Sequence, residues 1–88
     1  TRQEVALMEA AEEAGAIGTI EQGLKAEFRM ADHRVLHLYP LRVSVLLPFW
    51  PERLTRRRVV LPIYRAILRI RDVGLAQAIR RMARELEP

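Results

Sequence analysis

Residues 61–72, LPIYRAILRIRD, decide how the C-terminal half of this chain folds. Leu68 and Ile70 alternate with arginines, a pattern that is typical of a strand with one solvent-facing side. Asp72 follows directly and precedes VGLAQAIRRMARELE. An aspartate in that place can accept hydrogen bonds from the free amides of a helix's first turn. The stretch therefore predicts a strand over 66–71, a helix cap and a C-terminal helix.

A single long helix over residues 62–86 is the alternative interpretation. Ile63, Ile67 and Ile70 would then form the first part of its apolar stripe. Gly74 would lie inside this helix and cost it about 1 kcal/mol relative to alanine. We favour the strand followed by a helix, and the two interpretations imply different surfaces for the arginines.

The N-terminal third reads as two helices. Residues 3–14 place apolar side chains at helical spacing and end before Gly15, a plausible helix stop. The next segment opens with TIEQ, in which Thr19 and Gln22 have the spacing of a capping box. Apolar residues continue at helical spacing, so we predict a second helix over 20–31.

The central segment LRVSVLL, residues 41–47, alternates apolar and polar side chains and predicts a half-buried strand. Pro40 and Pro48 bracket it, because proline fixes its own backbone and restricts the residue before it. PERLTRRR could begin a short helix with Pro51 at its first position.

These segments predict a small α+β fold with acidic N-terminal helices, two or three short strands and a basic C-terminal helix. Residues 1–32 carry three basic and seven acidic side chains, whereas residues 33–88 carry twelve arginines and four acidic side chains. We expect an acidic helical segment over 1–32 that packs as one domain with a basic strand–helix segment over 33–88. Chain length supports at most one domain of 88 residues.

Composition narrows the setting of the protein. The chain has no cysteine, which excludes disulfides and thiolate chemistry and fits a reducing compartment. No apolar run approaches the roughly 20 residues that span a bilayer. The acidic N-terminus is unlike a signal or transit peptide. We therefore expect a cytoplasmic protein, which could lie at the cytosolic face of a membrane.

Three segments in order resemble the cytosolic region of the hemolysin-C/cyclin-M class of magnesium and cobalt efflux transporters. FRMADHRVLHLYPLR (28–42) resembles the entry to that family's first cystathionine-β-synthase (CBS) domain. LPIYR (61–65) is similar to a strand of the domain, and AILRIRDVGLA (66–76) to the following strand, aspartate and helix. The resemblance implies a shortened CBS domain, a homodimer, and sensing of an adenine nucleotide with magnesium.

The resemblance also implies a ligand site. The aspartate after the strand in CBS domains contacts a nucleotide ribose, and Asp72 matches it, with Arg69 and Arg71 nearby for phosphates. The plainer interpretation, which the residues themselves favour, is that Asp72 only caps its helix.

An arginine-rich stretch is the sharpest electrostatic feature. Guanidinium groups pair with phosphates in bidentate fashion, so it predicts an anion-binding patch. The alternative is a solvated surface, or a set of partners for the acidic helices. The candidate patch residues are Arg53, Arg56, Arg57, Arg58 and Arg65.

Other chemistry finds little support in the sequence. His33 and His37 lie four residues apart but have no evident third metal ligand, so we predict no metal site. No nucleophile–base–acid set is recognisable, so we predict no catalytic residues and no enzyme.

We expect a non-catalytic regulatory or protein-interaction module associated with transport, which forms a homo-oligomer or needs a partner subunit. The alternative is an arginine-rich accessory subunit that binds RNA, a membrane surface or an acidic protein.

Overall fold

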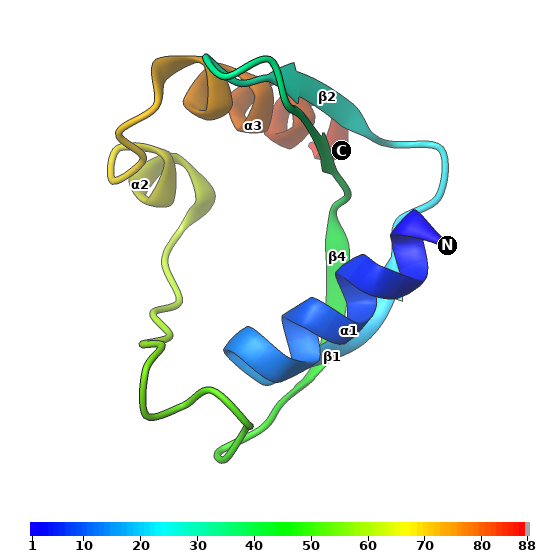
Figure 1. Ribbon diagram of the computed structural model, residues 1–88, viewed down its shortest axis with the longest axis vertical. Coiled ribbons are helices and arrows are strands. Elements are labelled where there is room, and N and C mark those ends of the chain that lie inside the picture. The colour runs from blue at the N-terminus through cyan, green and yellow to red at the C-terminus, as the bar shows by residue number, and fades with distance from the viewer. Residues whose placement is uncertain (88) are drawn as a thin grey trace. The chain divides into compact units, whose positions relative to one another are not determined.

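The computed structural model describes residues 1–87 and confirms the α+β class (Figure 1). Within these residues, three helices and four short strands follow one another. Their bounds are α1 (Arg2–Ala14), β1 (Ala16–Ile20), β2 (Ala26–Arg29), β3 (Val35–Leu38), β4 (Leu41–Leu46), α2 (Ile63–Ile67) and α3 (Val73–Leu86). No helix in residues 1–87 is long and apolar enough to cross a membrane.

The elements form two compact units that interleave along the sequence. The first unit joins residues 1–21 to residues 41–59 and contains α1, β1 and β4. The second unit joins residues 22–40 to the chain from Val60 onward and contains β2, β3, α2 and α3. The expectation that 1–32 and 33–88 pack as one domain stays a prediction.

Helix α1 is defined by its two ends. The Thr1 side chain accepts a hydrogen bond from the amide of Glu4, and the Glu4 side chain reaches back, which completes a capping box. Gly15 ends the helix in the left-handed conformation with φ of 63°. A side chain there would be strained, and its Cβ would also lie 3.1 Å from Trp50. The predicted helix and its glycine stop are confirmed.

The first unit's sheet pairs β1 with β4 in antiparallel register, and α1 packs against β1. The register slips between Ile17 and Gly18, where a β-bulge interrupts the ladder. A Cβ on Gly18 would lie 2.0 Å from the carbonyl oxygen of Arg42, so glycine is required for the two backbones to meet. The strand predicted over 41–47 is confirmed as β4 (Leu41–Leu46), but its predicted half-burial is wrong, because every residue after Leu41 is exposed.

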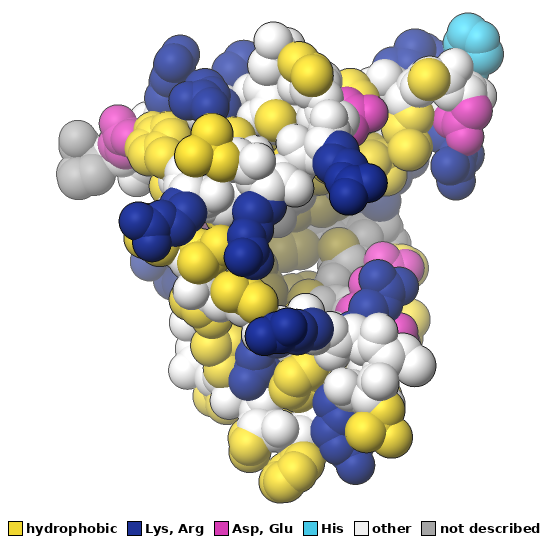
Figure 2. Space-filling view, turned by 90° about the vertical axis from the view of Figure 1, so that its left-hand side faces the viewer, with side chains coloured by type: hydrophobic (Ala, Val, Ile, Leu, Met, Phe, Trp, Pro, Cys, Tyr) yellow, Lys and Arg dark blue, Asp and Glu magenta, His cyan; other side chains and the backbone are white. Residues whose placement is uncertain are grey.

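The second unit is built around α3. The hairpin strands β2 and β3 pair antiparallel, and α3 packs on β2 while α2 packs on α3. Most of the well-buried apolar side chains of residues 1–87 lie on α2 and α3. They are Ile67, Ala78, Met82 and Ala83, with Ile20 in the first unit. Many other hydrophobic side chains stay at the surface, interspersed with basic side chains that are nearly all arginines (Figure 2).

The helix predicted over 20–31 is wrong. Ile20 ends β1, Gly23 turns the chain with φ of 80°, and residues 26–29 form β2. The helical spacing misled because Phe28 packs on α3 from a strand, where alternate residues share a face. Tertiary packing therefore overrode a capping-box signal.

Both interpretations of the opening stretch need correction. The strand predicted over 66–71 is wrong, because Ile63–Ile67 form the short helix α2 and the chain leaves it at Leu68. The single helix over 62–86 is also wrong, because residues 68–72 separate α2 from α3. The helix beginning after Asp72 is confirmed as α3.

The short helix predicted to start at Pro51 is also wrong. Residues 51–55 form consecutive turns. The amides of Thr55 and Arg56 both donate to the carbonyl of Glu52. These turns leave the arginine-rich stretch in an irregular loop of the first unit.

Candidate functional site

The arginine loop, residues 50–58 of the first unit, encloses an open pocket of about 330 Å³. That volume lies at the small end of the range for sites that take small molecules. Seven residues of the loop line it, and four of them are arginines: Trp50, Arg53, Leu54, Thr55, Arg56, Arg57 and Arg58. Arg65 belongs to α2 in the second unit and does not line this pocket.

Arg58 braces the loop from inside. Its Nη1 donates to the carbonyl oxygens of Ala14 at 2.9 Å and Leu47 at 2.8 Å. Its guanidinium also lies over the Trp50 ring, 4.4 Å from the centroid. The side chain is half-buried and ties the end of α1 to the exit of β4. Arg58 is thus foremost a structural residue.

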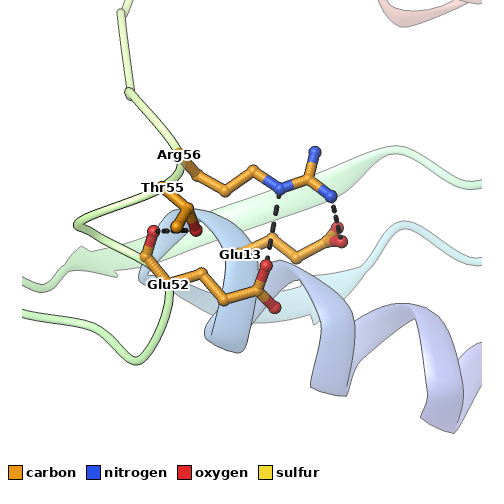
Figure 3. A network of polar contacts seen from close by, with 4 residues as sticks. All are labelled: Glu13, Glu52, Thr55 and Arg56. Carbon is orange, nitrogen blue, oxygen red and sulfur yellow. Dashed lines mark hydrogen bonds and ion pairs between the residues drawn. The ribbon is translucent and has the colours of Figure 1, made fainter.

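Arg56 belongs to a polar network that joins the loop to α1 (Figure 3). Its Nη2 lies 3.1 Å from Glu13 Oε1, and its Nε lies 3.4 Å from Glu52 Oε1. Thr55 Oγ1 donates to the carbonyl oxygen of Glu52 at 3.2 Å. All three charged groups are partly exposed, so each ion pair contributes at most about 1 kcal/mol. The charge of Arg56 is nevertheless balanced.

Arg53 and Arg57 keep their charge free of carboxylates. Arg53 Nη1 donates to the carbonyl oxygen of Trp50 at 3.1 Å, and its guanidinium lies 5.4 Å from the Phe49 ring centroid. Arg57 makes no hydrogen bond or ion pair with any residue of 1–87. The four arginines of the loop therefore differ in role. Arg58 is a structural brace, Arg56 is balanced by carboxylates, and Arg53 and Arg57 are cations without a carboxylate partner.

The Trp50 indole adds a second feature to the same pocket. Its Nε1 atom is buried and donates to no acceptor among the described residues. A buried donor without a partner costs about 1–3 kcal/mol.

Helix α1 carries several carboxylates near its C-terminal end. The sequence predicted an acidic helix there but did not identify these carboxylates as candidate site residues. Glu9 and Glu12 are exposed and make no side-chain hydrogen bond or ion pair within residues 1–87. Glu13 joins them one helical turn from Glu9 and pairs with Arg56. The last turn of α1 contains no basic residue, although the negative end of the helix dipole disfavours carboxylates there. This local electrostatic conflict was the signal that could have identified the face from the sequence.

Metal binding has limited support in the described part of the chain. No group of three or more His, Cys, Asp or Glu side chains there could hold a metal ion. Glu9 and Glu12 could supply two of the oxygen ligands that Mg²⁺ accepts, and a substrate and water would have to supply the others. His37 Nδ1 lies 3.5 Å from Glu27 Oε1 across the β2–β3 hairpin, and His33 lies in its turn with φ of 71°.

Asp72 is used as a helix cap. Its Oδ1 accepts a hydrogen bond from the amide of Leu75 at 3.0 Å. Arg69 and Arg71 are exposed and make no hydrogen bond or ion pair with the described residues. The predicted ligand role of these three residues stays a prediction, while the capping role is observed.

Comparison with known proteins points to a different class from the one expected. The chain is 32% identical over 81 residues to a protein of Arabidopsis thaliana named "Nudix hydrolase 21, chloroplastic". The alignment covers 88% of this chain and 41% of that relative, so this chain spans well under half of the relative's length. No family model matches, and no solved structure matches.

This similarity overturns three expectations from the sequence. The resemblance to CBS domains of ion transporters is contradicted, because the named relative is a hydrolase and no CBS family model matches. The non-catalytic regulatory or accessory role, with its association with transport, is contradicted by the same finding. So is the prediction that the chain is not an enzyme. Short segments of common residue types carried the CBS resemblance, whereas the new alignment runs over most of the chain.

Proposed function

We propose that this chain is part of a hydrolase related to Nudix hydrolase 21. The observation that carries the proposal is the 32% identity over 81 residues, which extends through both units. The chain spans 41% of that relative, so the relative's name does not by itself establish the activity of this chain.

The carboxylates of α1 are the groups best suited to hydrolysis. Hydrolysis needs a base that takes a proton from the attacking water, and glutamate is a common choice. Glu12 is the candidate base, because its side chain is free while its carbonyl oxygen accepts the amide of Glu52 at 3.0 Å, which fixes the helix end. Glu9 lies three residues earlier on the same helix face and supplies a second carboxylate.

The test is a hydrolysis assay, with Mg²⁺ present, of the natural protein that contains this chain. The panel contains a phosphoanhydride, a phosphate ester, a carboxylic ester and an amide. Glu12→Gln keeps the size of the side chain and removes its basicity, so we expect kcat to fall by roughly 10²–10⁴-fold. Glu85→Gln makes the same change on the exposed face of α3 and is expected to leave kcat unchanged.

Two results would refute the proposal. One is a folded natural protein, judged by circular dichroism, that contains this chain and hydrolyses no member of the panel above the rate in buffer. The other is a Glu12→Gln variant with the kcat of the parent chain, which would remove Glu12 from the reaction.

We also propose a reducing, cytoplasmic setting, which rests on the absence of cysteine. The relative's printed name places that protein in the chloroplast. Imaging of the natural protein with a fluorescent tag tests the proposal, and an exclusively organellar signal would contradict it.

A further inference from the structure

We propose that the surface of the second unit around α2 binds an anionic lipid bilayer. This α2 surface consists of the exposed side chains of Arg65, Leu68, Arg69, Arg71 and Val73. It contains none of the arginine loop and none of the carboxylates of α1, so the inference does not rest on the proposed hydrolysis. Its role is to attach the protein reversibly to a membrane surface.

The net charge of the chain lies entirely in the second unit. The first unit has six basic and six acidic side chains, which cancel. The second unit has nine basic and five acidic side chains, a difference of four that equals the +4 of the whole chain. Anionic bilayers attract basic segments that come within about one Debye length of the headgroups. The charge distribution therefore favours the second unit as the part that meets such a bilayer.

Three arginines of the α2 surface have no partner for their charge. The side chains of Arg65, Arg69 and Arg71 make no hydrogen bond or ion pair with any residue of 1–87. The one carboxylate between residues 60 and 73 belongs to Asp72, and its Oδ1 already accepts the amide of Leu75 at 3.0 Å. Anionic headgroups would therefore meet three cations that nothing in the described chain neutralises.

Helix α2 turns two of these arginines away from the core. Ile67 is 3% exposed and marks the buried side of the helix. At 3.6 residues per turn, Arg65 and Arg69 come about half a turn away from Ile67, on the opposite side. Leu68 has helical backbone angles, and the amide of Arg69 donates to the carbonyl of Ala66 at 3.0 Å, so the helical turn continues beyond α2. Basic and apolar side chains thus share the outward side of one short segment.

The most exposed large hydrophobic side chains of the second unit lie close to these arginines in the sequence. Val60, Leu68 and Val73 are 72%, 80% and 68% exposed, more than any other described there. Leu68 adjoins Arg69, and Val73 follows Arg71 by two residues. Large aliphatic side chains gain free energy when they leave water, and an arginine stem can lie along apolar surface while its guanidinium stays among headgroups. Apolar and basic contacts together are the two signals that stable peripheral membrane binding needs.

The chemistry of the α2 surface favours lipid over nucleic acid. Nucleic acids gain from stacking on exposed aromatic side chains. The aromatic residue of this segment, Tyr64, instead donates its hydroxyl to Glu87 Oε1, and its ring centroid lies 5.9 Å from the guanidinium carbon of Arg80. Leu68 and Val73 would stay in water beside a phosphodiester backbone, whereas a bilayer would cover them. A bilayer is also fluid, so it can cover side chains that project singly, while a protein partner must match their shape.

Sedimentation of the natural protein that contains this chain with lipid vesicles tests the proposal. One set of vesicles contains phosphatidylcholine alone, and the other contains phosphatidylcholine and phosphatidylserine in equal amounts. We expect binding to the phosphatidylserine vesicles and little binding to the others. We also expect this binding to weaken as added salt screens the charges.

Two variants, each with a matched control, locate the surface. Leu68→Gln should lower the affinity for phosphatidylserine vesicles about tenfold or more, whereas Leu54→Gln, at a leucine of the first unit that is 89% exposed, should leave it unchanged. Arg69→Gln should lower it about fivefold, whereas Arg57→Gln removes an unpaired cation of the first unit and should leave it unchanged. All four positions are exposed, so the fold should persist, and circular dichroism checks this.

Three results would overturn the proposal. No binding to either kind of vesicle would exclude the bilayer and leave the α2 surface to a protein partner. Equal binding to both kinds would show that the arginines have no part in it. Equal losses of affinity within either pair of variants would show that the contact is not made by the α2 surface. Hydrolysis is not measured in any of these experiments, so their outcome is independent of the proposed activity.

Discussion

Arg58 illustrates how one arginine can look like a ligand-binding group in the sequence and serve as a brace in the structure. It satisfies the last carbonyl of α1 and the carbonyl that follows β4, from a position 44 residues away from the former. Such cross-linking of two segment ends cannot be read from the run RRR, because the three arginines are chemically identical along the sequence. Only the turn at residues 51–55 decides which of them points inward.

Removing this brace should destabilise the first unit. Arg58→Met keeps most of the apolar stem but leaves the carbonyls of Ala14 and Leu47 without their donor, which should cost about 1–3 kcal/mol. Urea unfolding measures the effect, with Arg57→Met as the matched control because Arg57 has no partner among the described residues. Equal stability of the two variants would contradict the bracing role.

Tyr64 predicts a dependence of stability on alkaline pH. Its hydroxyl donates to Glu87 Oε1, and this hydrogen bond, followed by desolvation and the charge of Glu87, raises the pKa of Tyr64 above its ordinary value of 10.0. Because the folded pKa is the higher one, the stabilisation is fully present below the unfolded pKa. It is lost as the pH rises through the folded pKa.

The check is urea unfolding of the parent chain and of Tyr64→Phe, from neutral pH to above about 10. The parent should be the more stable at neutral pH, and the difference should shrink as the pH rises. If the difference in unfolding free energy between the parent and Tyr64→Phe does not change with pH, ionisation of Tyr64 is not linked to stability and the prediction is wrong.

At the scale of elements, α3 was predictable and the segments before it were not. Asp72 caps α3 as expected, since capping depends on side chains within one helical turn. Residues 20–31 satisfied the same local rules yet formed strands, because Phe28 packs on α3 and gains more from that contact than from a local helix. The reverse holds for residues 63–67, which form helix α2 at the place where a strand was expected to begin.

The sequence counted Gly74 as a cost to a single helix over residues 62–86, and the structure explains why a glycine lies at this place in α3. In the structure the Phe28 ring occupies the space beside it, and a Cβ would lie 2.2 Å from Phe28 Cε2. The glycine is therefore required for α3 to pack on β2, although it weakens the helix itself.

Gly74→Ala should consequently destabilise the protein. The gain in helix propensity is about 1 kcal/mol, but overpacking against an aromatic ring costs about 1–3 kcal/mol. Gln77→Ala, at an exposed position of the same helix, should be neutral or slightly stabilising. Thermal unfolding of both variants is the measurement, and a higher melting temperature for Gly74→Ala would contradict the packing of Phe28 on α3.

At the scale of the whole molecule, both sheets are small. Each has two strands, so every strand in residues 1–87 has one edge without a backbone partner. Two-stranded sheets are marginal without further cover. Strand β4 also exposes Val43 and Val45, with 45% and 48% of their surface in solvent. We therefore keep the expectation of a homo-oligomer as a proposal.

Light scattering over a range of protein concentrations tests this association. We expect a mass above that of one chain, and we expect Val45→Glu to lower it by placing a charge on the exposed face of β4. Val59→Glu is the control, since Val59 is similarly exposed but lies in a loop. A folded monomer at every concentration would contradict the proposal.

Sequence alone determined the α+β class, α1 with its glycine stop, β4, and the start of α3 at Asp72. These features follow from side-chain periodicity and from capping contacts a few residues apart, which are local properties. Tertiary structure decided the conformation of residues 20–31 and 63–67, the packing that requires Gly74, and the different roles of the four arginines of the loop. Those features depend on partners far away in the chain, whose identity is fixed only when the segments meet.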